Sequence, residues 1–228
     1  CSPHNPTGKV WTEEELKRMI EICKKYNVFI ISDEIHMDII YNGKHQPILS
    51  QAGDYIENIV LCTSASKTFN IPALCGSYLF ITNQKDKDEF LRILKNRDAL
   101  SSPSILAVIA TITAYNECGY WVDELVKYTE SNIKYVKEYL EKNIPILKCE
   151  IPQGAYFAWI DFSELGISNE EFQRNLIDIG GVAIMPGLTY GEEGRYFIRL
   201  NVGCSIKKVE EGLQRIEKAV KYIENKNN

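Results

Sequence analysis

Three short runs of apolar residues, many of them β-branched, constrain the fold of this 228-residue chain more than any other feature. They cover residues 28–31, 59–63 and 77–81. Continuous apolar runs of this length are typical of strands that are buried on both faces, as the strands of parallel sheets are. A helix with one apolar face is predicted before the first run, over residues 12–26, where Thr12 caps a first turn of glutamates. The first half of the chain is therefore predicted to form the later part of an α/β domain.

The second half of the chain has a different pattern. Residues 86–142 are helical in pattern almost throughout, with breaks at 101–103 and around Gly119. The last of these helices, 121–142, is long enough to join two domains. Beyond it we expect strands and helices in alternation, with strands at 155–162, 181–185 and 196–202 and helices at 169–178 and 205–225. The fold class predicted is α/β, with residues 1–120 forming part of a larger domain with a mostly parallel sheet flanked by helices, and residues 121–228 forming a smaller α+β domain.

Charge and composition exclude several classes of function. The net charge of -5 leaves no basic face, so we expect no nucleic-acid partner and no anionic membrane partner, although a small anionic ligand stays possible. No apolar stretch reaches the roughly 18–20 residues of a membrane-spanning helix, and no signal peptide opens the chain. The seven cysteines include no C-x-x-C pair and indicate buried thiols in a reducing compartment. The cytoplasm is therefore the expected location.

A lysine among hydroxyl side chains follows the second apolar run. Ser64, Ser66 and Lys67 lie in the segment 64–70, at the carboxyl end of a predicted strand, where open α/β sheets bind ligands. A lysine there is suited to a phosphate contact or to use as a nucleophilic amine. Taken by itself, the segment favours a solvated loop lysine over either of these roles.

An acidic segment follows the first apolar run. It contains Asp33, Glu34, His36 and Asp38, and places Asp33 at the same edge of the sheet. A buried carboxylate at that edge would need a cationic partner, because an unpaired buried charge is very costly. The close spacing also permits a metal site, which we disfavour because the fourth ligand would have to come from elsewhere. A third interpretation is a hydrogen-bonded and inert His36.

Asn5 and Arg199 are the two remaining candidates. Asn5 lies in His4-Asn5-Pro6-Thr7-Gly8, which is also a good turn sequence. Arg199 lies in a strand that is otherwise apolar, and its planar fork matches a carboxylate. The alternative for Arg199 is a salt bridge to a neighbouring acid.

The order of these four motifs resembles a known family. Asn-Pro-x-Gly, a strand ending in Asp-Glu, Ser-x-Ser-Lys and a late Arg-Leu-Asn together resemble the class I/II aminotransferase superfamily, fold type I of the pyridoxal-phosphate (PLP) enzymes. Within it, Pro3 to Pro6 with Trp11, the run 32–40 and the segment 66–70 resemble the cystathionine β-lyase (C–S lyase) branch. The resemblance covers the whole chain.

The resemblance implies that pyridoxal 5'-phosphate is the cofactor. Lys67 would hold it as a Schiff base and later move the substrate proton, and Asp33 would pair with its pyridinium nitrogen. Asn5 and His36 would lie near its phenolic oxygen. Ser64 and Ser66 would lie near its phosphate.

The resemblance also implies an amino-acid substrate, whose α-carboxylate Arg199 would bind. Tyr156 and Tyr190 are candidates to meet the substrate side chain, although packing is an equally good interpretation of both. The family's active sites lie at a subunit interface, which implies a homodimer in the full-length form.

Two departures from the family pattern affect the expected function. Many aminotransferases have an arginine eight positions after the lysine, where this chain has Cys75, and the lyase branch commonly lacks that arginine. In addition, the family's ring-stacking aromatic residue and phosphate-binding loop precede the Asn-Pro motif, so we expect this chain to be the C-terminal portion of a longer protein. Residues 1–120 would then be the later part of the PLP-binding large domain, and residues 121–228 the small domain.

The expected reaction is α,β-elimination on L-cystathionine or a related β-thio amino acid, giving pyruvate, ammonia and a thiol. An aminotransferase that uses the same residues is the alternative within enzymes. A truncated or regulatory form without activity of its own is the alternative outside them.

Overall fold

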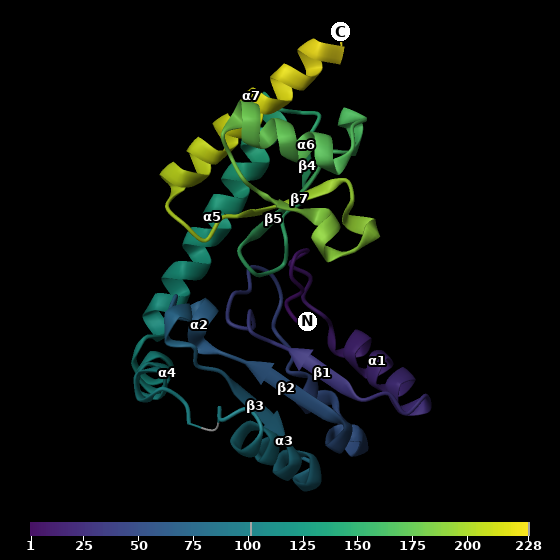
Figure 1. Cartoon of the computed structure of the whole chain (residues 1–228), viewed down its shortest axis with the longest axis vertical. Helices are drawn as coiled ribbons and strands as arrows, with labels where there is room; N and C mark the ends of the chain where they lie inside the picture. The colour runs from purple at the N-terminus through teal and green to yellow at the C-terminus, as the bar shows by residue number, and fades with distance from the viewer. Residues whose placement is uncertain (101, 228) are drawn as a thin grey trace. The chain divides into compact units, whose positions relative to one another are not determined.

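The computed structural model describes residues 1–100 and 102–227, which form two compact units (Figure 1). Unit 1 contains residues 1–4, 9–125 and 153–155, and unit 2 contains residues 5–8, 126–152 and those from 156 onward. The long helix α5, Gly119–Asn143, runs from one unit into the other.

Helix α1 of unit 1, Glu13–Lys25, begins as predicted. The Thr12 hydroxyl accepts a hydrogen bond from the backbone N–H of Glu15, and the Glu15 carboxylate accepts one from the N–H of Thr12. This reciprocal pair satisfies two N–H groups that the first turn would leave without partners. Leu16 and Ile20 on its apolar face are buried in a cluster with residues of the sheet and of the short 3-10 helices η1, Ile48–Gln51, and η2, Gly53–Asn58.

Unit 1 has a three-stranded sheet in the order β1-β2-β3, with strands Ile30–Asp33, Ile59–Thr63 and Tyr78–Ile81 (Figure 1). Strands β1 and β2 are parallel, as expected, but β3 is antiparallel to β2. A parallel return would need a crossover. The connection from β2 to β3 contains only the short helices α2, Ala65–Thr68, and η3, Pro72–Leu74, and it turns the chain back at the same edge.

The first strand was predicted two residues too early. The N–H of Val28 donates to the carbonyl of Cys23 and so closes the end of α1 instead of joining the sheet. Burial on both faces is also wrong for β1 within the described residues, because buried and exposed residues alternate along it and Ile31 is 70% exposed.

Three helices follow β3, as predicted: α3, Gln84–Asn96, α4, Ile105–Glu117, and α5. The predicted break at 101–103 includes Ser101, which lies outside the described residues. Helix α4 has no charged residue before Glu117, and many of its apolar side chains are exposed.

Unit 2 has a four-stranded antiparallel sheet in the order β4-β5-β7-β6. Its strands are Lys148–Cys149, Phe157–Asp161, Phe197–Asn201 and Met185–Pro186 in that spatial order. The strand predicted at 181–185 is shorter than expected, because Gly181 ends the preceding helix in the left-handed region (φ 68°) and the N–H of Val182 bonds back to Leu176.

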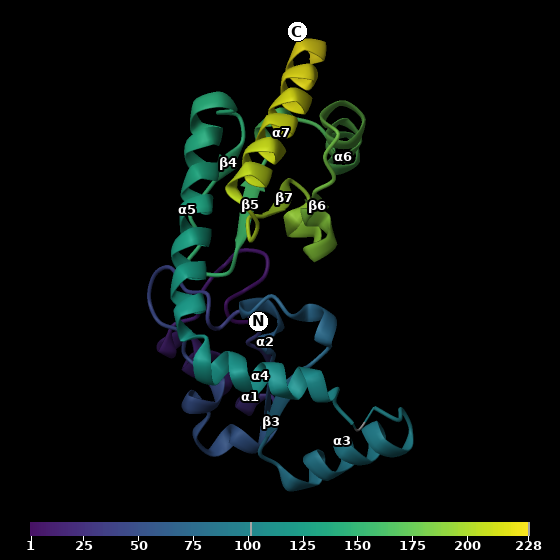
Figure 2. The ribbon, with the colours of Figure 1, turned by 90° about the vertical axis from the view of Figure 1, so that its left-hand side faces the viewer.

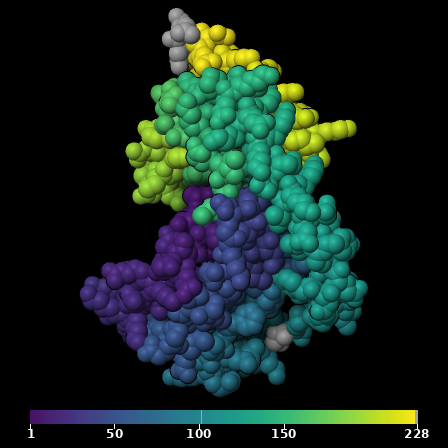
Figure 3. Space-filling model, turned by 180° about the vertical axis from the view of Figure 1, so that it is seen from behind, coloured from purple at the N-terminus to yellow at the C-terminus, as the bar shows by residue number. Residues whose placement is uncertain are grey.

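The helices of unit 2 pack beside this sheet (Figure 2). Helix α6, Asn169–Asn175, continues as the π-helical turn η5, Leu176–Gly180, and both contact α7, Ile206–Asn227. The apolar face of α7 is buried, with Leu213, Ile216 and Val220 fully enclosed. Its other face is exposed, as the yellow atoms in Figure 3 show. No helix within the described residues is both long and apolar enough to span a bilayer.

Candidate active site

Two of the predicted motifs meet at one edge of the unit 1 sheet. Strands β1 and β2 are parallel with Asp33 opposite Cys62, so the segments after both strands leave the sheet at the same edge. The N–H of Glu34 donates to the carbonyl of Cys62 at 2.8 Å, and the Thr68 hydroxyl donates to Oδ2 of Asp38 at 2.7 Å. These bonds join the acidic segment to the lysine segment, as the sequence predicted for a shared sheet edge.

Lys67 lies on the short helix α2, directly after β2. Ser64 starts this helix, because its hydroxyl accepts a hydrogen bond from the N–H of Ser66 at 3.0 Å. The Lys67 side chain is exposed and, within the described residues, its Nζ has no hydrogen bond or ion pair. The amine is therefore free to react with or bind a ligand at this edge.

The two serines differ in what their hydroxyl groups can do. The Ser64 side chain is buried, and its hydroxyl donates to the carbonyl of Gly76 in addition to capping α2. Its only proton is thus committed to the protein, so Ser64 does not fit the role of a phosphate donor in this arrangement. Ser66 is half-buried and stays a candidate for that role.

The buried carboxylate of the acidic segment is Glu34, whereas Asp33 is exposed. Asp33 is the last residue of β1 and lies on its open face, whereas Ser32 and Glu34, on either side of it, are buried. An exposed Asp33 does not need the cationic partner that a buried carboxylate would need. The Oδ1 atom of Asp33 accepts a hydrogen bond from the N–H of Ile35 at 3.1 Å. Burial and, secondarily, the Asp33 carboxylate raise the pKa of the neighbouring Cys62 thiol.

The side chains of the acidic segment diverge from one another. His36 is buried, Glu34 contacts His45, and Asp38 contacts Thr68. Among residues 1–100 and 102–227, no group of three His, Cys, Asp or Glu side chains has an arrangement that could hold a metal ion.

Arg199 and Asn5 are in direct contact in unit 2. The Nη1 atom of Arg199 donates to Oδ1 of Asn5 at 2.7 Å. The guanidinium lies over the rings of Phe157 and Tyr190, with centroid distances of 4.3 and 5.2 Å. This combination of an amide and two aromatic faces holds the guanidinium plane in one orientation.

One edge of the Arg199 guanidinium has no partner. Its Nε is buried and has no hydrogen bond within the described part of the chain, and Arg199 makes no ion pair there. The salt bridge considered as an alternative for this residue is thus not formed. A buried N–H donor without a partner is costly, and a carboxylate ligand would satisfy it.

Asn5 lies in a turn, as its sequence suggested, at a cis Asn5–Pro6 bond. Its amide is nevertheless also a binding group, because it accepts from Arg199. Tyr156 is half-buried in unit 2; burial raises the pKa of its hydroxyl, and Arg199 opposes that shift.

The structure thus contains two separate groups of candidate residues, one in each unit. Unit 1 brings together the segments that carry Asp33, His36, Ser64, Ser66 and Lys67, and unit 2 brings together Asn5 and Arg199.

Several connecting contacts were missed by the sequence interpretation. His45 pairs with Glu34, Asp38 accepts from Thr68, and the indole N–H of Trp121 donates to the carbonyl of Thr68 at 2.9 Å. Only the proximity of Asp38 to Asp33 in the sequence offered a signal. The other pairings join segments with no shared pattern.

The comparisons with known proteins agree with this fold. The family model described as aminotransferase class I and II matches residues 1–216. The chain is 46% identical to protein MalY of Escherichia coli over 98% of its own length, and 38% identical to cystathionine beta-lyase PatB of Bacillus subtilis over 96%. We conclude that the chain belongs to the aminotransferase class I and II family.

Solved structures of PLP-bound proteins share this fold. Cystalysin from Treponema denticola, which contains pyridoxal 5'-phosphate, matches with a TM-score of 0.91 and 33% identity over 97% of this chain and 56% of that one. The PLP-bound C–S lyase of Staphylococcus hominis matches with a TM-score of 0.87 and 32% identity over 96% of this chain and 56% of that one. The fold is that of the fold type I PLP enzymes, and the family's cofactor is PLP.

The chain spans 57% of the length of both MalY and PatB.

Proposed function

We propose that this chain supplies the catalytic lysine and the substrate-binding arginine of a PLP-dependent C–S lyase that performs α,β-elimination on a β-thio amino acid. The free amine of Lys67, at the edge where β1 and β2 both end, is the observation that carries the proposal. The relatives named as cystathionine beta-lyase or C–S lyase support the reaction class.

The residues of unit 1 fit the cofactor in three respects. Lys67 offers an unpartnered amine for the cofactor's aldehyde carbon, and Asp33 offers an exposed carboxylate for the proton of the ring nitrogen. Ser66 offers a partly exposed hydroxyl for the phosphate, whereas the Ser64 hydroxyl is already committed. When bound, PLP supplies an electron sink for the pair of electrons released at the substrate Cα. Lys67 is the base that would accept the Cα proton.

Unit 2 would orient the substrate. The unpartnered Nε of Arg199 and its planar fork fit the α-carboxylate of an amino acid, while Asn5 and the rings of Phe157 and Tyr190 hold the fork. Fixing the carboxylate determines which Cα bond is presented for cleavage. Asn5 is also the residue proposed to lie near the phenolic oxygen of the cofactor, and His36 is proposed for the same region.

Cys75 is the feature that favours elimination over transamination. It stands where many aminotransferases have a phosphate-binding arginine, and here it is exposed with a left-handed backbone (φ 54°) at the end of η3. A thiol cannot replace a guanidinium as a phosphate ligand. An aminotransferase using the same residues stays the alternative.

Borohydride reduction of the chain mixed with PLP tests the lysine assignment. We expect a reduced PLP adduct on the tryptic peptide that contains Lys67, and its loss in Lys67→Ala. Lys95 is an exposed lysine on α3, and Lys95→Ala is the matched control. If Lys67→Ala and Lys95→Ala form the same amount of reduced PLP adduct, the role of Lys67 would be refuted.

The reaction is tested in a full-length form. Release of pyruvate from L-cystathionine without an added keto acid supports the lyase, and amino transfer that depends on a keto acid without pyruvate supports the aminotransferase. An inactive full-length form that still takes up PLP would favour a regulatory protein.

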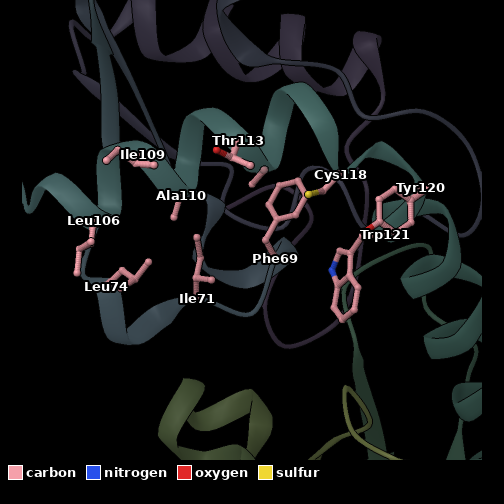
Figure 4. Close-up of a pocket in the computed structure, with 11 residues that line it drawn as sticks. Phe69, Ile71, Leu74, Leu106, Ile109, Ala110, Thr113, Cys118, Tyr120 and Trp121 are labelled. Carbon is pink, nitrogen blue, oxygen red and sulfur yellow. The ribbon is translucent and has the colours of Figure 1, made fainter.

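We also propose a homodimer in the full-length form. Helix α4 supports this, because a helix that is apolar nearly all round is normally buried. Ile105 is 74% exposed, and an apolar hollow lies beside the helix (Figure 4). Its walls come from α4, the segment after α2 and the start of α5, and include Phe69, Ile71, Leu74, Leu106 and Trp121. Light scattering during gel filtration of the full-length form would give twice the chain mass.

The two compact units are proposed to belong to the two domains of the family. Unit 1 would be the later part of the PLP-binding large domain, and unit 2 the small domain.

A further inference from the structure

The most completely enclosed charged side chain of unit 1 is Glu34, which lies next to Asp33 and to which the proposed function assigns no role. Glu34 is 0% exposed. Its Oε1 accepts hydrogen bonds from the Ser32 hydroxyl and from the N–H of Ile48, both at 3.0 Å. Its Oε2 lies 2.7 Å from Nε2 of His45. Both carboxylate oxygens therefore have partners, and the burial of the charge is compensated.

The backbone of Glu34 is held equally firmly. Its N–H donates to the carbonyl of Cys62 at 2.8 Å, and its carbonyl accepts from the N–H of Met37 at 3.0 Å and from the Thr63 hydroxyl at 3.3 Å. The residue thus connects the end of β1 to the end of β2 and to the turn that follows.

The fixed position of Glu34 also limits the direction of the neighbouring Asp33 side chain. Glu34 directly follows Asp33, the last residue of β1, and is buried where Asp33 is exposed. Fixing Glu34 on the packed face therefore constrains the direction of the neighbouring Asp33 side chain on the open face. Within the described residues, the Asp33 side chain accepts one hydrogen bond, from the N–H of Ile35 to Oδ1 at 3.1 Å, and that bond depends on the backbone path through Glu34.

His45 is the partner that brings a distant segment to this anchor. Its side chain is 10% exposed, and its Nδ1 has no hydrogen bond within the described residues. A carboxylate oxygen accepts hydrogen bonds, so Nε2 donates to Oε2 in the tautomer that has its proton on Nε2. This fixes the loop that contains His45 and Ile48 against the back of β1.

We infer that Glu34 and His45 form a positioning pair that holds the Asp33 carboxylate at the sheet edge in the orientation required to meet the ring nitrogen of the cofactor. The inference rests on the proposed function, because that function gives Asp33 its role. Glu34 is buried on the packed side of the strand, whereas the Asp33 side chain is exposed on the other side.

Hydrogen exchange of the chain without cofactor tests the positioning directly. The amide of Ile35 reports on Asp33, because it donates to that side chain. We expect His45→Ala to increase the exchange rate of Ile35 at least tenfold, and His45→Gln, which keeps an N–H donor, to restore part of the protection. Lys24→Ala is the matched control, because it removes an exposed ion pair with Asp54 in the same unit. Unchanged exchange at Ile35 in His45→Ala and in Glu34→Gln would overturn the inference.

Cofactor affinity separates positioning from general stability. We expect His45→Ala to weaken PLP binding, measured from the visible absorption of the bound cofactor, about tenfold in the wild-type background. It should change affinity less than twofold when Asp33 is already replaced by Asn, because the pair acts through Asp33. Equal losses in both backgrounds would show a merely structural role and refute the inference. A wild-type chain that takes up no PLP would count against the proposed function instead, and the exchange of Ile35 would then decide the inference alone.

Discussion

Arg199 donates a hydrogen bond from Nη1 to Oδ1 of Asn5 across 2.7 Å, although 194 positions separate the two residues in the chain. Two groups that were assigned separately from the sequence, one to the cofactor and one to the substrate, are therefore neighbours. The contact uses one edge of the guanidinium and leaves Nε available for a ligand.

Replacing Arg199 with Lys tests the value of this fork. Lysine keeps the positive charge, but a single ammonium cannot hold Asn5 and a carboxylate together in one plane. We expect KM for the amino-acid substrate of a full-length form to rise about tenfold to a hundredfold. This rise corresponds to the loss of one charge-assisted hydrogen bond, which contributes roughly 1.5–3 kcal/mol. Steady-state kinetics measures it. A KM within twofold of the wild type would show that Arg199 does not bind the carboxylate.

Asp38 is expected to stabilise the helix that carries Lys67. It accepts from the hydroxyl of Thr68, which is fully buried, so Asp38→Ala leaves a buried donor without a partner. The free energy of unfolding should fall by about 1–3 kcal/mol. Asp54→Ala, which breaks an exposed pair with Lys24, should cost only about 0–1 kcal/mol. Urea unfolding compares the two, and equal losses would refute the assignment.

Gly154 lies where a side chain cannot fit. Gly154 forms an isolated antiparallel β-bridge with Ile40, which brings it close to the backbone of Ile39. A Cβ atom at position 154 would lie 2.5 Å from the carbonyl oxygen of Ile39. We expect Gly154→Ala to lower the free energy of unfolding by about 1–3 kcal/mol through overpacking. Gly212 in α7 has open space around it, so Gly212→Ala should instead stabilise the helix by roughly 0.5–1 kcal/mol. Loss of stability only at Gly212 would contradict both assignments.

Cys149 should make stability depend on pH in the alkaline range. Burial raises the pKa of its thiol from 9 to about 12. Between these values the unfolded chain has released a proton that the folded chain keeps, so the free energy of unfolding falls as the pH rises from 9 to about 12. Below pH 9 this contribution is fully present. Denaturant unfolding at pH 8 and pH 10.5 measures the decrease.

The control for this pH dependence is Cys149→Ala, whose free energy of unfolding should decrease less over the same pH range.

Cys75, which is exposed, should react with iodoacetamide in the folded chain at pH 8, whereas Cys149 should react only on unfolding. A folded chain alkylated at Cys149 as fast as at Cys75 would contradict the burial of that thiol.

The sequence alone determined the local elements and the identity of the chemical groups. Thr12 and the glutamates after it specified the start of α1, and the apolar runs specified two strands that end at the same edge, because capping and β-branching act over a few residues. The motif order gave the family, which the family model over residues 1–216 shows. The roles of Lys67 and Asp33 stay predictions.

Only the tertiary structure decided which groups are buried and which contact each other. It placed Glu34 rather than Asp33 inside, paired Glu34 with His45, and reversed β3, because burial and pairing depend on segments that approach from elsewhere in the chain. The bond between Asn5 and Arg199 has the same origin. Local patterns state what a residue can donate or accept, and the packed chain selects its partner.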